Sequence, residues 1–169
     1  NRCGHMKGKQ VTPLDEQQPL LSSDGGGASA SISVAENSSA VTTVVASDAD
    51  LPAQTLTYSI IGGADQARFN INPGTGVLSF ASAPDYESPS DANLDNVYDV
   101  TVQVSDGSLA STQAISVTVT PLNDQRPVIT SDGGGASASI SVAENSSGVT
   151  TMVASDADMP AQTLTYSII

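Results

Sequence analysis

An internal duplication constrains this chain more than any other feature of its sequence. When the sequence is shifted by 108 positions, residues 11–61 align with residues 119–169, and 42 of the 51 aligned positions are identical. Self-similarity at a fixed period is typical of tandem repeat proteins. The sequence therefore predicts units of 108 residues in series, with one complete unit followed by the first part of the next.

The duplication also predicts the domain boundaries. Residues 1–10 have no counterpart in the second copy and hold three of the five basic residues, so we expect a cloning remnant or foreign leader. Residues 11–21 are then an inter-repeat linker, 22–120 a complete repeat, 121–128 a second linker and 129–169 the start of the next repeat. A part of that size buries too little apolar surface to fold alone. We expect it to be disordered or to borrow strands from another copy, a route to strand-swapped homo-oligomers.

Within the complete repeat, apolar residues alternate with polar ones, which is the period of a half-buried strand. The clearest alternation covers residues 98–104 and 115–119. Shorter β-rich runs occupy residues 30–34, 41–46, 56–60, 69–71 and 77–80. Seven short antiparallel strands in a unit of this length are typical of a two-sheet sandwich. The predicted fold class is all-β: an immunoglobulin-like, seven-stranded Greek-key β-sandwich in tandem repeats.

Charge excludes several classes of partner. The chain has 18 acidic and 5 basic residues and a net charge of −13, and after residue 10 only Arg68 and Arg126 are basic. Such a polyanion does not attract nucleic acid. No continuous run of 18 apolar residues is present, so the sequence predicts no membrane span in this fragment. Cys3 is the only cysteine, which excludes an intramolecular disulfide.

The acidic residues gather at predicted turns and linkers. Carboxylates that lie within a few ångströms of one another repel unless a cation neutralises them. Calcium fits this residue composition because it takes six to eight oxygen ligands from Asp, Glu, Asn and backbone carbonyl groups. Zinc is disfavoured because the repeat lacks nitrogen and sulfur ligands. The alternative interpretation is that the acids are surface charge that keeps the protein soluble.

Nine short motifs occur in the order and spacing of a cadherin repeat. They are Val34-Ala35-Glu36-Asn37, Val45-Ala46-Ser47-Asp48-Ala49-Asp50, Tyr58-Ser59-Ile60, Phe69-Asn70-Ile71, Thr75-Gly76-Val77-Leu78, Asp85-Tyr86-Glu87, Tyr98-Asp99-Val100-Thr101-Val102, Asp106-Gly107 and Asn123-Asp124-Gln125-Arg126-Pro127. The resemblance covers everything after residue 10. The near-identical copies resemble the prokaryotic cadherin-like repeats of large secreted adhesins and polysaccharide-associated proteins.

The resemblance implies a calcium cluster at each junction between repeats. At the junction within this chain the implied ligands are Glu36, Asp85, Glu87, Asn123, Asp124, Asp156 and Asp158. At the other end, the lower half of an equivalent junction is implied at Asp15, Glu16, Asp48, Asp50 and Asp106. Pro121 and Gln125 depart from the family's linker pattern, so we expect fewer ions or weaker binding than the pattern implies.

A second acidic loop, residues 91–96, has ligand spacing like the start of an EF-hand. The position that needs a bidentate Glu in an EF-hand is occupied by Val102, so this motif is rejected. Two interpretations stay open for the loop. It holds a single ion, or it is a polar surface turn whose Asn and Asp side chains bind their own backbone.

The implied function is an extracellular, calcium-dependent adhesion module in which ions stiffen the joint between repeats. The expected partners are identical repeats, through homophilic contacts, or a cell-surface polysaccharide. The alternatives are a passive calcium-stiffened spacer arm and a carbohydrate-binding appendage of a polysaccharide-degrading or surface protein. We expect no enzyme, because His5 is the only histidine and lies in the predicted remnant. We expect the aromatic residues of the repeat to be core rather than a sugar platform.

Overall fold

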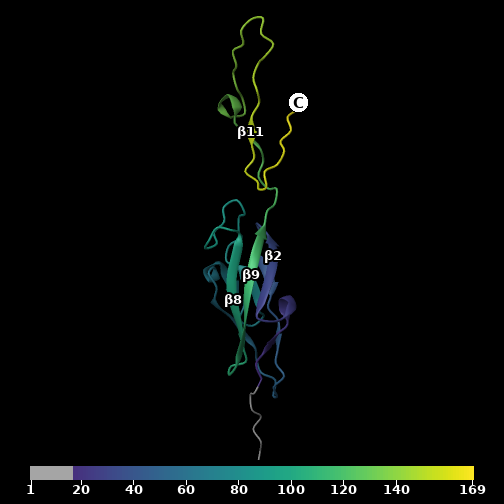
Figure 1. Cartoon of the computed structure of the whole chain (residues 1–169), viewed down its shortest axis with the longest axis vertical. Helices are drawn as coiled ribbons and strands as arrows, with labels where there is room; N and C mark the ends of the chain where they lie inside the picture. The colour runs from purple at the N-terminus through teal and green to yellow at the C-terminus, as the bar shows by residue number, and fades with distance from the viewer. Residues whose placement is uncertain (1–16) are drawn as a thin grey trace, which may run out of the picture.

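Two sheets packed face to face form the first repeat in the computed structural model, which describes residues 17–169 (Figure 1). The larger sheet has the strand order β2 (Ser29–Ala35), β9 (Ala110–Thr120), β8 (Val97–Ser105) and β5 (Thr57–Gly62). The smaller sheet has the order β3 (Ala40–Thr43), β7 (Val77–Phe80) and β6 (Phe69–Ile71). Residues 17–169 contain no α-helix and only three short 3-10 turns, so the all-β prediction is confirmed.

The connections between the strands differ from the expected pattern in two places. β2 pairs with β9 in parallel, with Ile32 opposite Val117, so the expectation that every strand is antiparallel is wrong for this pair. The run 41–46, expected as one strand, is divided between β3 and β4 (Ala46–Ser47), and β4 pairs with β1 (Leu20–Leu21) instead. The chain therefore leaves the smaller sheet after Thr43 to close the lower end of the sandwich.

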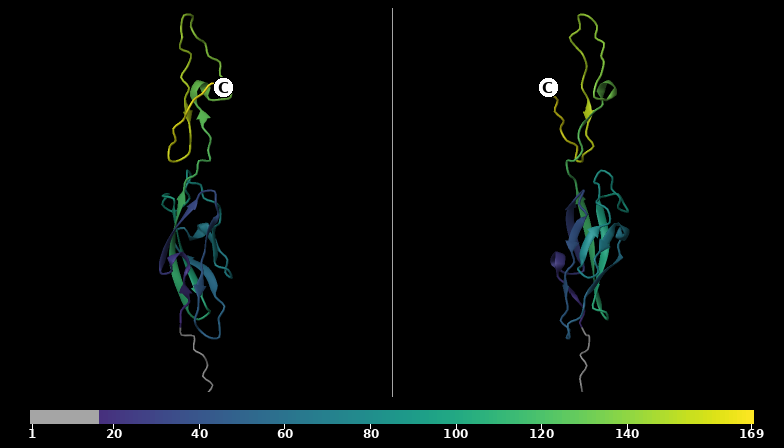
Figure 2. Two further views of the ribbon diagram at one scale, coloured as in Figure 1. Left: turned by 90° about the vertical axis from the view of Figure 1, so that its right-hand side faces the viewer. Right: turned by 180° about the vertical axis from the view of Figure 1, so that it is seen from behind.

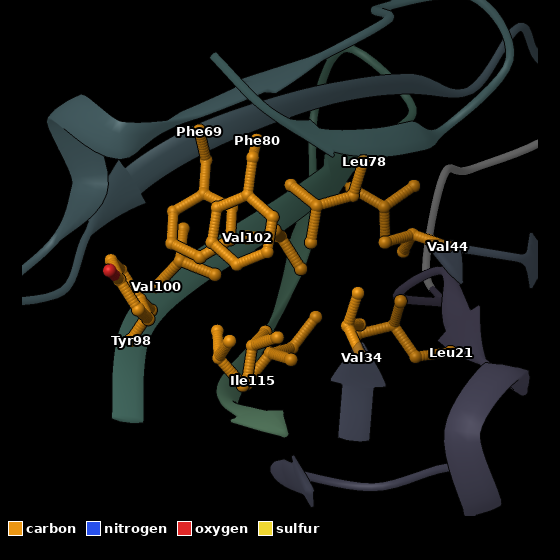
Figure 3. Close-up of a cluster of buried hydrophobic side chains, with 13 residues drawn as sticks. Leu21, Val34, Val44, Phe69, Leu78, Phe80, Tyr98, Val100, Val102 and Ile115 are labelled. Atoms are coloured by element: carbon orange, nitrogen blue, oxygen red, sulfur yellow. The ribbon is translucent and has the colours of Figure 1, made fainter. Parts of the chain in front are cut away.

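The core lies between the two sheets and follows from the alternation in β8 and β9. Tyr98 and the three valines that follow at every second position of β8 are buried, and the same alternation holds along β9. Figure 3 shows Phe69 and Phe80 stacked above Tyr98, with ring centroids of the two Phe residues 4.8 Å apart. Tyr98 meets Phe80 edge-on at 5.2 Å, a favoured aromatic geometry. The prediction that the aromatic residues form core is confirmed for these three.

A tight turn at residues 72–76 connects β6 with β7 and contacts the chain that leaves β3 at Val44. The Asn72 side chain accepts hydrogen bonds from the amides of Gly74 and Thr75, and the Val44 amide donates to the Gly76 carbonyl at 2.8 Å. Gly76 has a φ of 70°, and a Cβ there would collide with the Val44 carbonyl oxygen. The turn thus needs glycine at this position, because other residues resist a positive φ and the approach leaves no room for a side chain.

Residues 129–169 continue beyond the end of the sandwich where β9 ends (Figures 1 and 2). They repeat the local features of the first copy: β10 (Val128–Ile129) pairs with β11 (Ala154–Ser155) as β1 pairs with β4, and the 3-10 turn η3 (Ser131–Gly133) repeats η1 (Ser23–Gly25). The other 3-10 turn is η2 (Gln66–Arg68). Most side chains of the segment are exposed. Among the described residues, no helix is long and apolar enough to span a bilayer.

Candidate metal centre

A buried glutamate marks the end of the sandwich from which the linker leaves. Glu36 follows directly after β2, and only 2% of its surface is exposed. Its amide donates to the Thr120 carbonyl at 3.0 Å, which fixes it beside the last residue of β9. Its Oε1 accepts a hydrogen bond from the Leu122 amide at 2.6 Å, and its Oε2 accepts one from the Tyr86 amide at 2.8 Å. The carboxylate is therefore fixed between the linker and the loop after β7.

That loop brings two more carboxylates to Glu36. Asp85 Oδ1 accepts hydrogen bonds from the Glu87 amide at 3.1 Å and from the Ser88 amide at 3.2 Å, a turn that Asp forms readily. One carboxylate oxygen each from Glu36, Asp85 and Glu87 lies within 4.8 Å of the others. Glu36 thus forms one acidic cluster with two residues that lie about fifty positions later in the sequence.

A second acidic cluster shares Glu87 and joins the sandwich to the residues beyond it. Carboxylate oxygens of Glu87, Asp124 and Asp158 lie within 4.8 Å of one another. Asp158 is only 2% exposed, and its Oδ1 accepts a hydrogen bond from the linker amide of Gln125 at 3.0 Å. Glu87 Oε1 accepts a hydrogen bond from the Met159 amide at 2.9 Å. The sandwich, the linker and the start of the next repeat therefore meet at this point.

Such close carboxylates repel strongly when all are ionised. At 4.8 Å, two unit charges repel by about 1 kcal/mol in bulk water and by about 3 kcal/mol at an effective dielectric constant near 20. The backbone amides that point at Glu36 and Asp158 offset part of this cost. A hard cation with oxygen ligands offsets more, and the five carboxylates of the two clusters are the donor set that calcium prefers. The residues present thus fit calcium.

The other implied ligands of this junction lie beside the clusters. Asn123 Nδ2 donates to Gln162 Oε1 at 2.8 Å, and Asp156 Oδ1 accepts from the Asp158 amide at 3.0 Å. Sequence reasoning missed Gln162 and also Asn37, whose Nδ2 donates to Asp124 Oδ2 at 2.6 Å. The signal for Gln162 was its repetition, because it is the counterpart of Gln54 in the first copy. The sequence marks Asn37 only by its position directly after Glu36, and Asn is common in turns.

The opposite end of the sandwich carries a set of buried oxygens that lack hydrogen-bond donors. Oδ1 of Asp48 accepts from the Asp50 amide, and Oδ1 of Asp106 accepts from the amides of Ser108 and Leu109. In contrast, Oδ2 of Asp48, Oδ2 of Asp106 and Oε1 of Gln54 are buried without a hydrogen-bond partner among residues 17–169. Buried acceptors without donors are costly unless an ion or water satisfies them. Asp48, Asp50 and Asp106 stay predicted ligands, since the groups of three carboxylates that lie within 4.8 Å of one another among residues 17–169 are at the other end of the sandwich.

The opposite end was also predicted to include Asp15, Glu16 and Asp50, and residues 91–96 were predicted to form an acidic loop. Asp15 and Glu16 lie outside the described residues. Asp50 Oδ2 accepts a hydrogen bond from the Gln17 amide at 3.0 Å, so it is turned toward the chain that enters the repeat. In the loop 91–96, the buried Asp91 accepts from the amides of Asp95 and Asn96. These bonds favour the interpretation of that loop as a turn that binds its own backbone.

Comparison with known proteins agrees with this architecture. A family model described as the cadherin domain matches residues 30–120. The chain is 34% identical over 134 residues to human protocadherin Fat 1, covering 75% of this chain and 3% of that protein. It is 34% identical over 91 residues to mouse cadherin-related family member 3, covering 52% of this chain and 10% of that protein. The chain thus spans a small fraction of the length of these curated relatives.

Solved structures show the same likeness. Extracellular cadherin domains 3–6 of protocadherin gamma B2 match with a TM-score of 0.60 and 25% identity, over 88% of this chain and 37% of that one. Domains EC1–2 of human protocadherin-24 match with a TM-score of 0.60 and 27% identity, over 85% of this chain and 63% of that one. The prokaryotic type expected from the sequence stays a prediction, since the curated relatives named above are human and mouse proteins. By its family match, its sandwich and its relatives, the chain belongs to the cadherin-domain family.

Proposed function

We propose that this chain is part of an extracellular adhesion protein in which calcium at the joint between repeats stiffens a tandem array. Cadherin domains are adhesion modules rather than enzymes, and they generally bind calcium. The proposed division is a linker at 11–21, a complete repeat at 22–120, a second linker at 121–128 and the start of the next repeat at 129–169.

One contact carries the proposal: Glu87 belongs to both acidic clusters. It lies within 4.8 Å of Glu36 and Asp85 in the sandwich and within the same distance of Asp124 and Asp158 across the joint. An ion that bound at Glu87 would therefore connect three parts of the chain. Without an ion, the like charges favour separation of those parts, because each additional carboxylate adds repulsion. The proposed ligands remain those implied by the resemblance, with Asn37 and Gln162 as supporting side chains.

Calcium titration followed by thermal unfolding and small-angle X-ray scattering tests this function. We expect the unfolding temperature of the chain to rise with calcium, with dissociation constants of about 0.1 to 1 mM, the range typical of extracellular modules, so that 5 mM calcium is close to saturating. We also expect the scattering to show a narrower distribution of dimensions, because the joint loses freedom. An unchanged unfolding temperature together with unchanged dimensions at 5 mM calcium would contradict the metal assignment.

A matched pair of variants separates the joint from general surface charge. Glu87→Gln removes the carboxylate shared by both clusters and should reduce the calcium response strongly. Asp24→Asn removes one charge from an exposed side chain that binds Thr42, far from the joint in sequence and in the fold, and should keep the full response. If both variants lose the response equally, calcium acts by screening net charge rather than by binding at the joint.

The partner of the array requires separate assays. Aggregation of beads coated with the chain, reversed by chelator, supports homophilic adhesion. A calcium-dependent signal on a glycan array supports the carbohydrate-binding alternative. Calcium-dependent stiffening without either signal leaves the passive spacer. Phe69, Phe80 and Tyr98 are buried in the core, so these three rings offer no stacking surface for a sugar.

A further inference from the structure

Two aliphatic side chains are exposed on the complete repeat where β1 pairs with β4. Leu20 is 68% exposed, and Val45 is 48% exposed. Leu20 lies opposite Ser47 in this strand pair. The Ser22 amide donates to the Val45 carbonyl at 2.9 Å, which places Val45 two residues further along the same pairing. Leu20 and Val45 are therefore diagonal neighbours on the outer face of these strands, within reach of each other.

A third aliphatic side chain extends this surface onto the smaller sheet. Val77 is 47% exposed and pairs with Thr43, two residues before Val45 in the chain. Val44 lies between these two and is only 1% exposed, so its side chain faces the core while its neighbours face outward. Leu20, Val45 and Val77 therefore form one aliphatic surface, which we call the outer patch.

The two copies together show that repeats in series do not cover this patch themselves. In the complete repeat, every strand of the sandwich is in place, and Leu20 and Val45 are still exposed. Their counterparts Val128 and Val153 follow directly after a complete repeat, and they are 59% and 49% exposed. A preceding repeat therefore leaves these positions open as well. A tandem array thus presents aliphatic side chains to solvent with a period of 108 residues.

The outer patch is bordered by neutral hydroxyl groups, unlike the end of the sandwich that holds the clustered carboxylates. The strand partners of its residues include Ser47 and Thr43. The acids beside it are Asp24, whose carboxylate binds Thr42 Oγ1 at 3.1 Å, and Asp48, which follows Ser47. The chain as a whole has a net charge of −13. Two copies that meet at this surface therefore repel less than copies that meet at a carboxylate cluster.

We propose that the outer patch binds the outer patch of a second copy of this chain, so that arrays associate side by side. Three side chains cover far less than the about 800 Å² per partner that a stable complex buries, so one pair of repeats associates weakly. Linked contacts raise the apparent affinity by about 10²–10⁴ when all of them form together. A second array of the same repeats has the matching spacing, which an unrelated partner does not share. The inference rests on the proposed function in taking the repeats as units of an adhesive array.

The symmetry of such a contact predicts which residue meets its own equivalent. Contact between two identical patches is isologous, so a two-fold axis passes through its centre. Val45 lies between Leu20 and Val77 in the patch and is therefore nearest to that axis. Side chains at position 45 of the two copies should thus lie close together.

Cross-linking at this position tests the contact in solution. In a Cys3→Ser background, Val45→Cys is treated with a short bis-maleimide at about 1 mM chain, a concentration that populates weak complexes. The matched control is Ile61→Cys, because Ile61 is also 48% exposed and lies on β5 of the other sheet. We expect several-fold more cross-linked dimer from Val45→Cys than from Ile61→Cys. Equal yields at the two positions overturn the proposal.

Aggregation of coated beads tests the linked contacts. The full chain is coupled to beads through Cys3, its only cysteine. A patch variant replaces two aliphatic residues of each copy by Thr, which suits exposed strand positions: Leu20→Thr, Val45→Thr, Val128→Thr and Val153→Thr. We expect this variant to slow aggregation at least about tenfold, whereas Ile61→Thr keeps the rate within about twofold. A patch variant that aggregates as fast as the unmodified chain overturns the proposal.

Salt shows whether the contact is apolar. Raising NaCl from about 0.05 to about 0.5 M screens the repulsion between acidic chains. Aggregation through the outer patch should therefore stay constant or become faster. A rate that falls several-fold with salt indicates ionic contacts instead and overturns the proposal.

Calcium and thermal unfolding separate this proposal from the proposed function. The patch variant should keep the rise in unfolding temperature with calcium, which also shows that it is folded. If both proposals hold, about 5 mM calcium speeds aggregation several-fold, because a stiff array keeps its patches in register. Aggregation that ignores calcium supports the patch and rejects stiffening. A full calcium response without aggregation overturns the patch, as does a glycan-array signal that only the patch variant loses, which would assign the patch to a carbohydrate.

Discussion

Among the described residues, Gln113 is the one core residue whose polar side chain is fully buried without any hydrogen bond. It lies on β9 opposite Val102, is 0% exposed, and neither its Oε1 nor its Nε2 has a hydrogen-bond partner. The residues at every second position after it, beginning with Ile115, are apolar and buried. Replacement of Gln113 by Met keeps an unbranched side chain of similar length and removes both unpaired groups. We therefore predict that Gln113→Met stabilises the repeat.

The size of the gain follows from the cost of an unpaired polar group. Each buried donor or acceptor without a partner costs about 1–3 kcal/mol. Imperfect packing of the new side chain cancels part of that gain, since shape changes in a core cost up to about 1.5 kcal/mol. We expect a net gain of about 2 kcal/mol in the free energy of unfolding. For a domain of this size, that corresponds to a rise of about 10 °C in the unfolding temperature.

Urea unfolding followed by circular dichroism measures this gain directly. The midpoint should rise while the slope m stays constant, because the same surface is exposed on unfolding. All samples contain the same calcium concentration, since bound ligand shifts apparent stability. The matched control is Gln103→Met on β8, where the side chain is not fully buried, and its effect should stay within about 0.5 kcal/mol.

An unchanged or lower midpoint for Gln113→Met would refute the reasoning. It would mean that the amide is satisfied in solution, for example by an ordered water with two to four hydrogen bonds. Gln113→Leu distinguishes that outcome from poor packing of Met, because Leu also removes the amide but fills the site with a different shape and leaves no large cavity. If Leu and Met are equally destabilising, the amide contributes favourable interactions.

Three further substitutions test individual contacts in the same unfolding assay. Gly76→Ala should cost about 2 kcal/mol or more, because φ is 70° and the new Cβ meets the Val44 carbonyl; a neutral result would contradict the turn geometry. Tyr98→Phe should cost about 1 kcal/mol by removing the acceptor of the Ser90 amide at 3.1 Å, unless water replaces the hydroxyl. Asp65→Asn should cost about 2 kcal/mol, because this buried carboxylate accepts two backbone amides, and an unchanged midpoint would show that its charge is irrelevant there.

The strands could be predicted from sequence where alternation is regular, and their partners could not. Residues 98–104 were expected as a strand and lie within β8. The parallel pairing of β2 with β9 was missed, because alternation reports which face is buried but not the direction of the neighbouring strand. The start of β9 was also missed. A glutamine at position 113 reads as a polar residue, although the strand buries it completely.

For the candidate site too, part could be predicted from the sequence and part could not. Glu36, Asp85 and Glu87 are far apart in the sequence, and only the resemblance to a family grouped them before their proximity was known. The amides of Gln54 and Gln162 were missed because a neutral polar side chain in a turn is ordinarily solvated. Their contribution depends on burial and on the neighbours that converge at each end of the sandwich, which no local pattern in the sequence reports.

The differences between the two copies gather at the joints rather than in the sandwich. Six of the nine differing positions lie between residues 15 and 22, in and beside the linker. Only three differences lie in residues 29–61, and one of them replaces the buried Val44 by Met152 in the second copy. The linker ligands implied by the resemblance therefore differ between the two joints, because Asp15 and Glu16 stand where the second linker has Asn123 and Asp124. A joint with a different set of oxygen ligands should bind calcium with a different affinity, because ligand charge tunes that affinity.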